Sequence, residues 1–238
     1  MKKYNLLLTL PLLFLLIGCM DRVDVGATQT DSQSVELGDA ESAVVAIQMG
    51  VGQLNVSGGA TNLMDAEFTY NIETWRPIVD YQQRGRIGEL QISQPASEIN
   101  GIPNSNIKYS WEIALNDDVP LEMDIDLGVG ESDLNLGGLT LQSLLIDTGV
   151  GKATVDLTGD WQQSFDVTIN GGVGETIIYL PEGVGLRVAA STGIGSLVIN
   201  GLEKDGDLYT KAAYGDSEVT ITLDIEGGIG QITVQVGR

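Results

Sequence analysis

The sequence predicts an all-β protein, and three observations support that class. From about Leu37 onward, apolar and polar residues alternate almost throughout, as in "VVAIQM", "EFTYNI" and "GELQIS", which is the period of strands with one buried face. No stretch has the spacing of an amphipathic helix. A Gly-Val-Gly or Gly-Ile-Gly triplet also recurs along the chain, which predicts a stacked repeat.

The clearest single strand is "IKYSWEIAL", whose two faces have different chemistry. One face is expected to be buried and carries Ile107, Tyr109, Trp111, Ile113 and Leu115. The preceding segment, Pro95 to Asn106, is rich in proline, glycine and asparagine and is predicted to be a loop.

The same pattern of flanking residues surrounds every triplet of the chain. Their first glycines are Gly50, Gly128, Gly149, Gly172, Gly193 and Gly228. The residues five before, three before and six after the first glycine are apolar in every copy, whereas the residue two before it is always polar. This regularity predicts a strand, a corner and a second strand in each repeat, with the central Val or Ile turned inward.

The triplets do not match known nucleotide-binding or calcium-binding loops. A dinucleotide loop reads G-x-G-x-x-G, but none of the six residues at the place of the third glycine is glycine: Asn55, Asp133, Thr154, Ile177, Val198 and Thr233. Thr176 and Ile232 replace the aspartate of the calcium-binding nonapeptide. The glycines are therefore interpreted as structural corners, because glycine adopts unusual φ values at little cost.

Composition narrows the possible functions. Acidic residues outnumber basic ones 33 to 12, which disfavours nucleic acid and anionic lipid headgroups as direct partners of the folded part. The chain has no histidine and a single cysteine, which removes Ser-His and Cys-His nucleophile pairs and most zinc and copper sites. We therefore expect no enzyme activity and no cofactor.

The amino terminus has the features of a bacterial lipoprotein signal. Lys2 and Lys3 precede a 12-residue apolar run, "LLLTLPLLFLLI", which is too short to cross a bilayer as a helix. The following tetrad, Leu-Ile-Gly-Cys ending at Cys19, resembles the lipobox, in which the peptide is cut before a cysteine that carries diacylglycerol. The sequence thus predicts a signal peptide over 1–18, lipidation of Cys19, and location on the extracytoplasmic side of the bacterial cell envelope.

Three further segments follow the signal peptide. Residues 19–36 are polar without strand periodicity and are expected to form a flexible tether. Residues 37–118 are expected to form an amino-terminal β domain, and residues 119–238 a solenoid built from the Gly-Val-Gly repeats.

The repeats resemble a known family, the bacterial toastrack domain of LiaF-like proteins, also called the cell-wall-active antibiotics response family. The matching segments are "INGGVGETIIYLPEGVGLRV", "STGIGSLVINGL" and "IEGGIGQITVQV", and upstream "VVAIQMGVGQLNVSGGATNLMDAEFTYNIE" resembles the amino-terminal unit. The resemblance implies a right-handed, single-stranded β-helix-like solenoid without agreed catalytic residues. Some family members work with two-component systems that sense envelope stress.

Candidate sites are few and weakly marked. Asp126 and Asp147 occupy one position on successive repeats and could bridge a cation, although solvated surface charge explains them as well; Glu131 and Asp133 are close in sequence. A ladder at another repeat position could form outward hydrogen bonds or a strip that contacts glycan: Asn135, Asp156, Tyr179 and Asn200.

Two functional classes remain open from the sequence. The first is a lipid-anchored envelope protein with a non-catalytic binding, adhesion or stress-sensing role toward a protein or glycan partner. The second is a carbohydrate-active enzyme that uses two carboxylates. A pocket that converges two acids would favour the enzyme, and flat, uniform faces would favour the binding protein.

The lipid anchor is directly testable. Cys19→Ser removes the thiol that would carry the lipid, so we expect the variant to be released from membranes or mislocalised. Detergent-phase partitioning of cell fractions measures this, and a variant that partitions like the parent protein would contradict the lipoprotein assignment.

Overall fold

The computed structural model describes residues 25–95, 106–211 and 214–238, and these residues form one sheet of 13 strands. Within them the only helical element is the 3₁₀ turn η1 (Glu73–Trp75). The strands are β1 (Gln29–Val35), β2 (Ser42–Gly58), β3 (Met64–Tyr70), β4 (Ile78–Arg84), β5 (Ile87–Ser93), β6 (Tyr109–Leu115), β7 (Pro120–Asn135), β8 (Thr140–Asp156), β9 (Phe165–Leu180), β10 (Gly185–Asn200), β11 (Glu203–Asp205), β12 (Leu208–Thr210) and β13 (Thr220–Val236). The predicted all-β class, a β-helix-like solenoid with an amino-terminal β unit, is confirmed.

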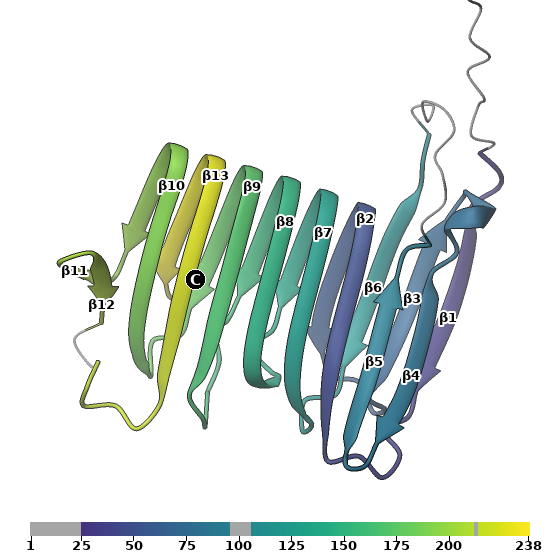
Figure 1. The fold of residues 1–238 in the computed structure, drawn as a ribbon, viewed down its shortest axis with the longest axis horizontal. Helices are drawn as coiled ribbons and strands as arrows, with labels where there is room; N and C mark the ends of the chain where they lie inside the picture. The colour runs from purple at the N-terminus through teal and green to yellow at the C-terminus, as the bar shows by residue number, and fades with distance from the viewer. Residues whose placement is uncertain (1–24, 96–105, 212–213) are drawn as a thin grey trace, which may run out of the picture.

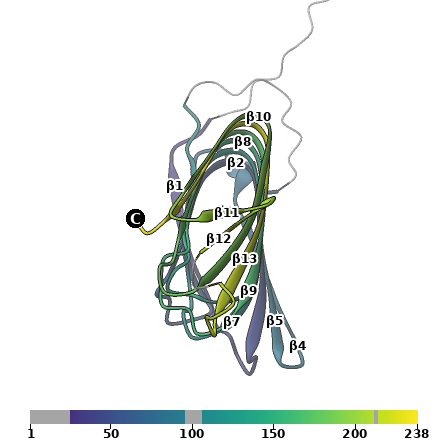
Figure 2. The same ribbon diagram turned by 90° about the vertical axis from the view of Figure 1, so that its left-hand side faces the viewer.

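Six long strands form the rungs of the solenoid. Each is 16 or 17 residues long and contains one glycine triplet near its middle: β2, β7, β8, β9, β10 and β13. Every rung folds back on itself at its triplet, so that it contributes an arm to each of two facing layers (Figures 1 and 2). We call the layer of arms before the triplets wall A and the layer after them wall B.

The space between the two walls holds the hydrophobic core. Residues five and three before the first glycine of the triplet face it from wall A, and the residue six after that glycine faces it from wall B. In β7 these are Met123, Ile125 and Leu134, all buried; the equivalent residues of the other rungs belong to the same cluster, except that Ala190 and Ile199 of β10 are partly buried and pack against it. The apolar positions predicted from the repeat are therefore core positions.

The rungs are parallel and in register, but they do not follow chain order. The order in the sheet is β2-β7-β8-β9-β13-β10, so the last strand lies between β9 and β10. Both arms of β13 are apolar on the inner face, as Leu223 and Val234 illustrate. Because β13 lies between two other rungs, neighbouring strands cover these residues on both sides. The second arm of β10, which carries exposed Ser196 and Asn200, takes the end of wall B.

The amino-terminal unit extends both walls from β2. β5 pairs with the first arm of β2 and β4 follows it in wall A, whereas β6, β3 and β1 continue wall B from the second arm of β2. The expected buried face of β6 is confirmed, with Trp111 fully enclosed and in edge-to-face contact with Phe68 and Tyr109. The expected domain boundary at 118/119 falls between β6 and β7, and the core is continuous across it.

The tether prediction is wrong for seven of its residues. Gln29–Val35 form β1, which pairs antiparallel with all of β3. The sequence of β1, QTDSQSV, has no apolar alternation that would predict a strand, and none of its residues is buried. β1 forms because its backbone hydrogen-bonds to β3, which would otherwise be an edge strand of the sheet.

Several predictions fall outside the described residues. The signal peptide over 1–18, the lipidation site Cys19 and residues 96–105 of the predicted loop all lie there. In the ranges that are described, no helix has the length and apolar character needed to cross a bilayer.

The triplets form the corners, as predicted, because their glycines touch across rungs. The second glycines are register partners from rung to rung, such as Gly130, Gly151 and Gly174. At Gly151, φ is +145°, and an added Cβ would overlap the carbonyl oxygen of Gly130. A side chain at this position would therefore strain the backbone and separate the rungs.

The predicted inward orientation of the central Val or Ile is wrong. Val129, Val150, Val173 and Ile229 are 47–51% exposed, and Ile194 is 69% exposed. Strict alternation would point these side chains inward, but the alternation breaks at the bend, where the second glycine of each triplet has a φ of +144° to +153°. The branched side chain therefore points outward from the bend.

The corner can be tested with one substitution and a matched control. Gly151→Ala should lower the free energy of unfolding by about 1 to 3 kcal/mol from backbone strain alone. Gly183→Ala is the control, because a Cβ there meets nothing within 4 Å and its φ is not positive. Denaturant unfolding of both variants gives the comparison, and equal stability would contradict the corner assignment.

Candidate functional site

The outer face of wall B carries aligned polar side chains and a groove. Register aligns its outward side chains into rows across the strands. One row runs from β1 to β8 and comprises Ser32, Glu67, Glu112, Asn55, Asp133 and Thr154. A groove of about 690 Å³ follows this row and its neighbour across β1, β3, β6, β2 and β7. We call it the wall B groove.

Four carboxylates line the wall B groove. Glu67 and Glu112 are direct cross-strand partners, and Asp133 lies two strands beyond Glu112. The Asn55 side-chain amide, between them, donates a hydrogen bond to Glu112. Side chains that face each other across antiparallel strands have Cβ atoms about 5 Å apart, so the two glutamates lie side by side.

The fourth carboxylate, Asp65, is held in place by its neighbours. The hydroxyl of Ser34 donates to Asp65 Oδ1 at 2.6 Å, and the amide of Asn62 donates to the same oxygen at 3.3 Å. These two hydrogen bonds, the Ser34 bond first, lower the pKa of Asp65 below its usual range. Asp65 is therefore an anion at neutral pH and is not suited to donate a proton as a general acid.

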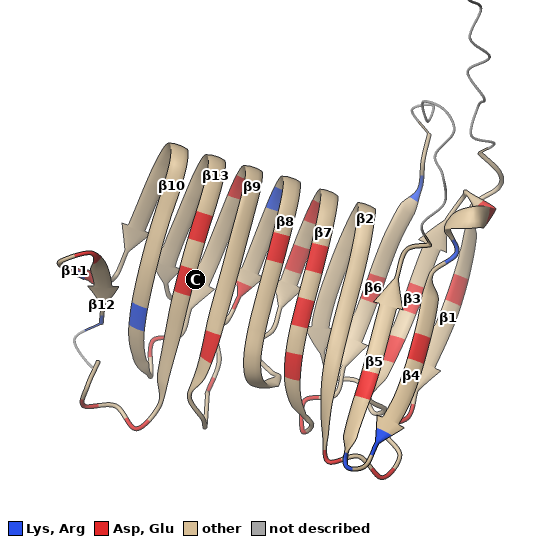
Figure 3. Cartoon of the chain, in the orientation of Figure 1, with Lys and Arg blue, Asp and Glu red and all other residues tan. Residues whose placement is uncertain are grey.

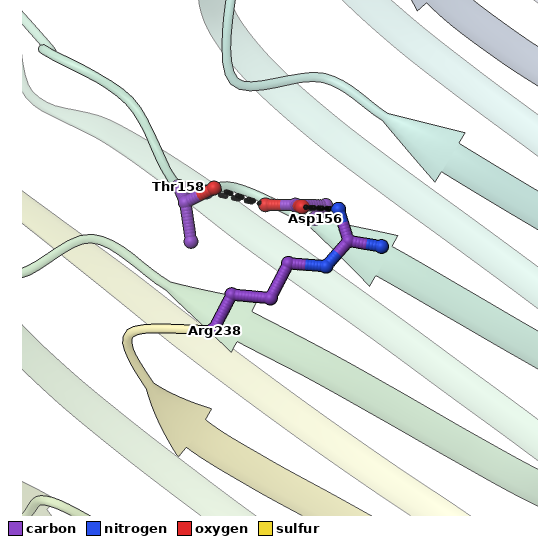
Figure 4. Close-up of polar contacts among 3 residues, drawn as sticks. All are labelled: Asp156, Thr158 and Arg238. Carbon is purple, nitrogen blue, oxygen red and sulfur yellow. Dashed lines mark hydrogen bonds and ion pairs between the residues drawn. The ribbon is translucent and has the colours of Figure 1, made fainter.

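Arg238 lines the groove at its solenoid end, and its contact with Asp156 is drawn in Figure 4. Its Nη1 donates to Asp156 Oδ2 at 3.0 Å, and its guanidinium lies over the ring of Tyr179. Asp156 also accepts hydrogen bonds from the backbone N–H and the hydroxyl of Thr158. Its side chain is only 5% exposed, so this carboxylate is satisfied within the protein and is not presented to a ligand.

The predicted ladder is only partly a neighbouring set. Asn135, Asp156 and Tyr179 are register partners on β7, β8 and β9, but Gln235 of β13 lies between Tyr179 and Asn200. The insertion of β13 interrupts the ladder, and Asp156 forms an internal ion pair where an outward contact was expected.

Asp126 and Asp147 are neighbours, as predicted, on the outer face of wall A. Asp147 accepts a hydrogen bond from the side chain of Asn170 at 2.7 Å. Within the described ranges, no group of three or more His, Cys, Asp or Glu side chains is placed to hold a metal ion. The pair alone supplies too few ligands for a calcium or magnesium site.

Acidic residues are spread over both walls, and basic residues are sparse (Figure 3). Glu131 and Asp133 both lie on the outer face of wall B. Lys152, the register partner of Glu131, forms an ion pair with Glu175 at 3.1 Å.

The sequence analysis did not single out Glu67 and Glu112. Their proximity follows from the pairing of β3 with β6, which no local pattern reveals.

The fold and this surface define a two-walled β-solenoid with a polar outer groove, and the comparisons place the chain in a family. The family model described as the N-terminal domain of toast_rack matches residues 24–179. The family model described as cell wall-active antibiotics response LiaF, C-terminal, matches residues 128–234. The chain belongs to the toastrack family with a LiaF-like carboxy-terminal part.

Solved structures include a near relative. A structure described as a "putative cell adhesion protein" from Clostridium sporogenes is 34% identical, covers 89% of this chain and 100% of its own, and superposes with a TM-score of 0.86. A "putative adhesin" from Bacteroides fragilis is 13% identical, covers 90% of this chain and 99% of its own, and has a TM-score of 0.34. No curated protein matches the chain.

The hydrogen bonds to Asp65 predict how the stability of the fold changes with pH and how one substitution changes the pKa of Asp65. Its folded pKa lies below the unfolded value, so the hydrogen bonds stabilise the fold above about pH 4, and the contribution is lost as the pH falls through the folded pKa. Ser34→Ala should raise the pKa of Asp65, measured by NMR titration of its carboxyl carbon. Ser32→Ala, on the same face of β1, is the control; equal Asp65 titrations in the two variants would contradict the assignment.

Proposed function

We propose that this protein is a lipid-anchored envelope protein that binds a partner without catalysis, and that the wall B groove is the contact surface. Family membership and the 34% identity to the structure described as a "putative cell adhesion protein" support an envelope-related role of this kind. The lipobox-like segment ending at Cys19 supports the anchor. The partner is an envelope protein or glycan on the extracytoplasmic side.

The observation that carries the proposal is the chemistry of the wall B groove. The groove spans strands of the amino-terminal unit and the first rungs, and carboxylate, amide and hydroxyl groups line it. Among the described residues, Glu67, Asp133 and Asn135 have no side-chain hydrogen-bond partner within the protein, so their acceptors and donors are open to a ligand. A polar surface of this kind is suited to hydroxyl groups or basic side chains of a partner.

A second candidate function has one observation in its favour. Glu67 and Glu112 are direct cross-strand partners, which brings two carboxylate side chains together, and retaining glycosidases use two carboxyl groups about 5 Å apart. Such enzymes need one carboxyl that remains protonated and one that is ionised, and this difference arises from unlike environments. Both glutamates are exposed on the same open face, which favours binding over catalysis.

The two candidates are separated by one pair of variants. The full chain, purified in detergent, is assayed for hydrolysis of peptidoglycan and envelope glycans and for binding to envelope fractions. We expect no turnover, and Glu67→Gln with Glu112→Gln should weaken binding about tenfold, equivalent to about 1.4 kcal/mol. Binding should also weaken as salt is raised.

The matched control removes the same charge elsewhere. Glu122→Gln with Asp124→Asn changes two exposed carboxylates on the outer face of wall A and should leave binding unchanged. Equal binding by both double variants would remove the groove from the proposal. Turnover that Glu67→Gln with Glu112→Gln abolishes would establish the enzyme in its place.

A further inference from the structure

The solenoid carries an exposed apolar ridge along its corners, on a surface separate from the wall B groove. The central residues of the six triplets are register partners from rung to rung: Val51, Val129, Val150, Val173, Ile229 and Ile194. Neighbouring strands lie about 4.8 Å apart, so the row is about 24 Å long. We call it the corner ridge.

Packing within the protein does not require aliphatic residues on the corner ridge. Val129, Val150, Val173 and Ile229 are each about half exposed and Ile194 is exposed further, whereas Val51 at the β2 end is half-buried. Threonine would give the same β-branched preference for strand without exposing methyl groups in a continuous row. Scattered exposed apolar residues need no explanation, but a contiguous row with a polar border is typical of an interaction site.

Acidic residues border the corner ridge on both sides. Asp126, Asp147 and Glu226 occupy one row on the wall A side, three residues before the ridge. On the wall B side, two residues after the ridge, Glu131 and Glu175 flank Lys152, which pairs with Glu175. These six residues carry five negative charges and one positive charge, a net of −4.

We infer that the corner ridge binds a cationic amphipathic helix from another protein or peptide. Such a helix has one apolar stripe with Lys or Arg on either side, which complements an apolar row between two acidic borders. Its rise per turn, about 5.4 Å, is close to the rung spacing of about 4.8 Å, so one apolar residue per turn meets one rung. A ridge of about 24 Å fits about 16 helical residues.

The same charges disfavour two other occupants. A second copy would bring two acidic borders together, and a bilayer rich in anionic lipid would be repelled by them. This inference concerns a different surface from the proposed function and does not depend on the wall B groove.

The test uses the full chain in phosphatidylcholine nanodiscs, with empty nanodiscs as the blank. The probe is an 18-residue peptide of Leu and Lys with its leucines on one helical face; a scrambled peptide of the same composition and a Leu/Glu peptide are the comparisons. We expect the amphipathic Leu/Lys peptide to bind and the other two to bind at least tenfold more weakly. Equal binding of the scrambled peptide would overturn the inference.

Two double variants locate the binding surface. Val150→Thr with Val173→Thr should weaken peptide binding about tenfold, whereas Ile78→Thr with Ile87→Thr, at equally exposed positions on β4 and β5, should leave it unchanged. Asp126→Asn with Asp147→Asn should weaken binding and reduce its salt dependence. Matching thermal unfolding curves show that the variants are folded, and equal peptide affinity of the two threonine variants would overturn the inference.

The alternative occupants have their own readouts. Val150→Cys, labelled with an environment-sensitive dye, should respond to the Leu/Lys peptide and not to replacement of phosphatidylcholine by phosphatidylglycerol. Bifunctional thiol crosslinking of the unlabelled Val150→Cys protein should give no dimer. A dye response to anionic lipid, or a crosslinked dimer, in the absence of peptide binding would assign the ridge to that occupant and overturn the inference.

Discussion

The contact between glycine backbones at the corners is the constraint on which the rest of the structure depends. Gly130, Gly151 and Gly174 stack so closely that no Cβ fits between neighbouring rungs. This contact lets each long strand bend in the same place and keep its hydrogen bonds to the next rung on both arms. The two walls, the core between them and the outward row of Val and Ile all follow from that single bend.

Stacking also explains why the rungs occur together. A single rung buries its apolar residues on one side only and leaves both edges of its backbone without partners. The amino-terminal unit continues both walls at one end, and the β11–β12 hairpin extends wall A at the other. Arg238 ties the end of β13 to β8 through Asp156, so the strand inserted out of order is also held by a side-chain contact.

The two outer surfaces have different chemistry and are suited to different partners. The wall B groove is polar and presents carboxylates and amides from strands that are distant in sequence. The corner ridge is apolar and is built from one residue of each repeat. In a solenoid, equivalent positions of successive rungs lie in one row. A repeat position whose side chain is not needed in the core therefore forms a linear surface.

The sequence by itself determined the strand content, the repeat, its buried positions and the corner role of the glycines. These features are local, because alternation and glycine spacing are set within one rung and are copied in the next. The tertiary structure decided which strands are neighbours, including the place of β13 between β9 and β10 and the pairing of Glu67 with Glu112. It also made β1 a strand and turned Val150 outward, because an edge that accepts hydrogen bonds and a bend repeated at the same place in every rung exist only once the rungs are stacked.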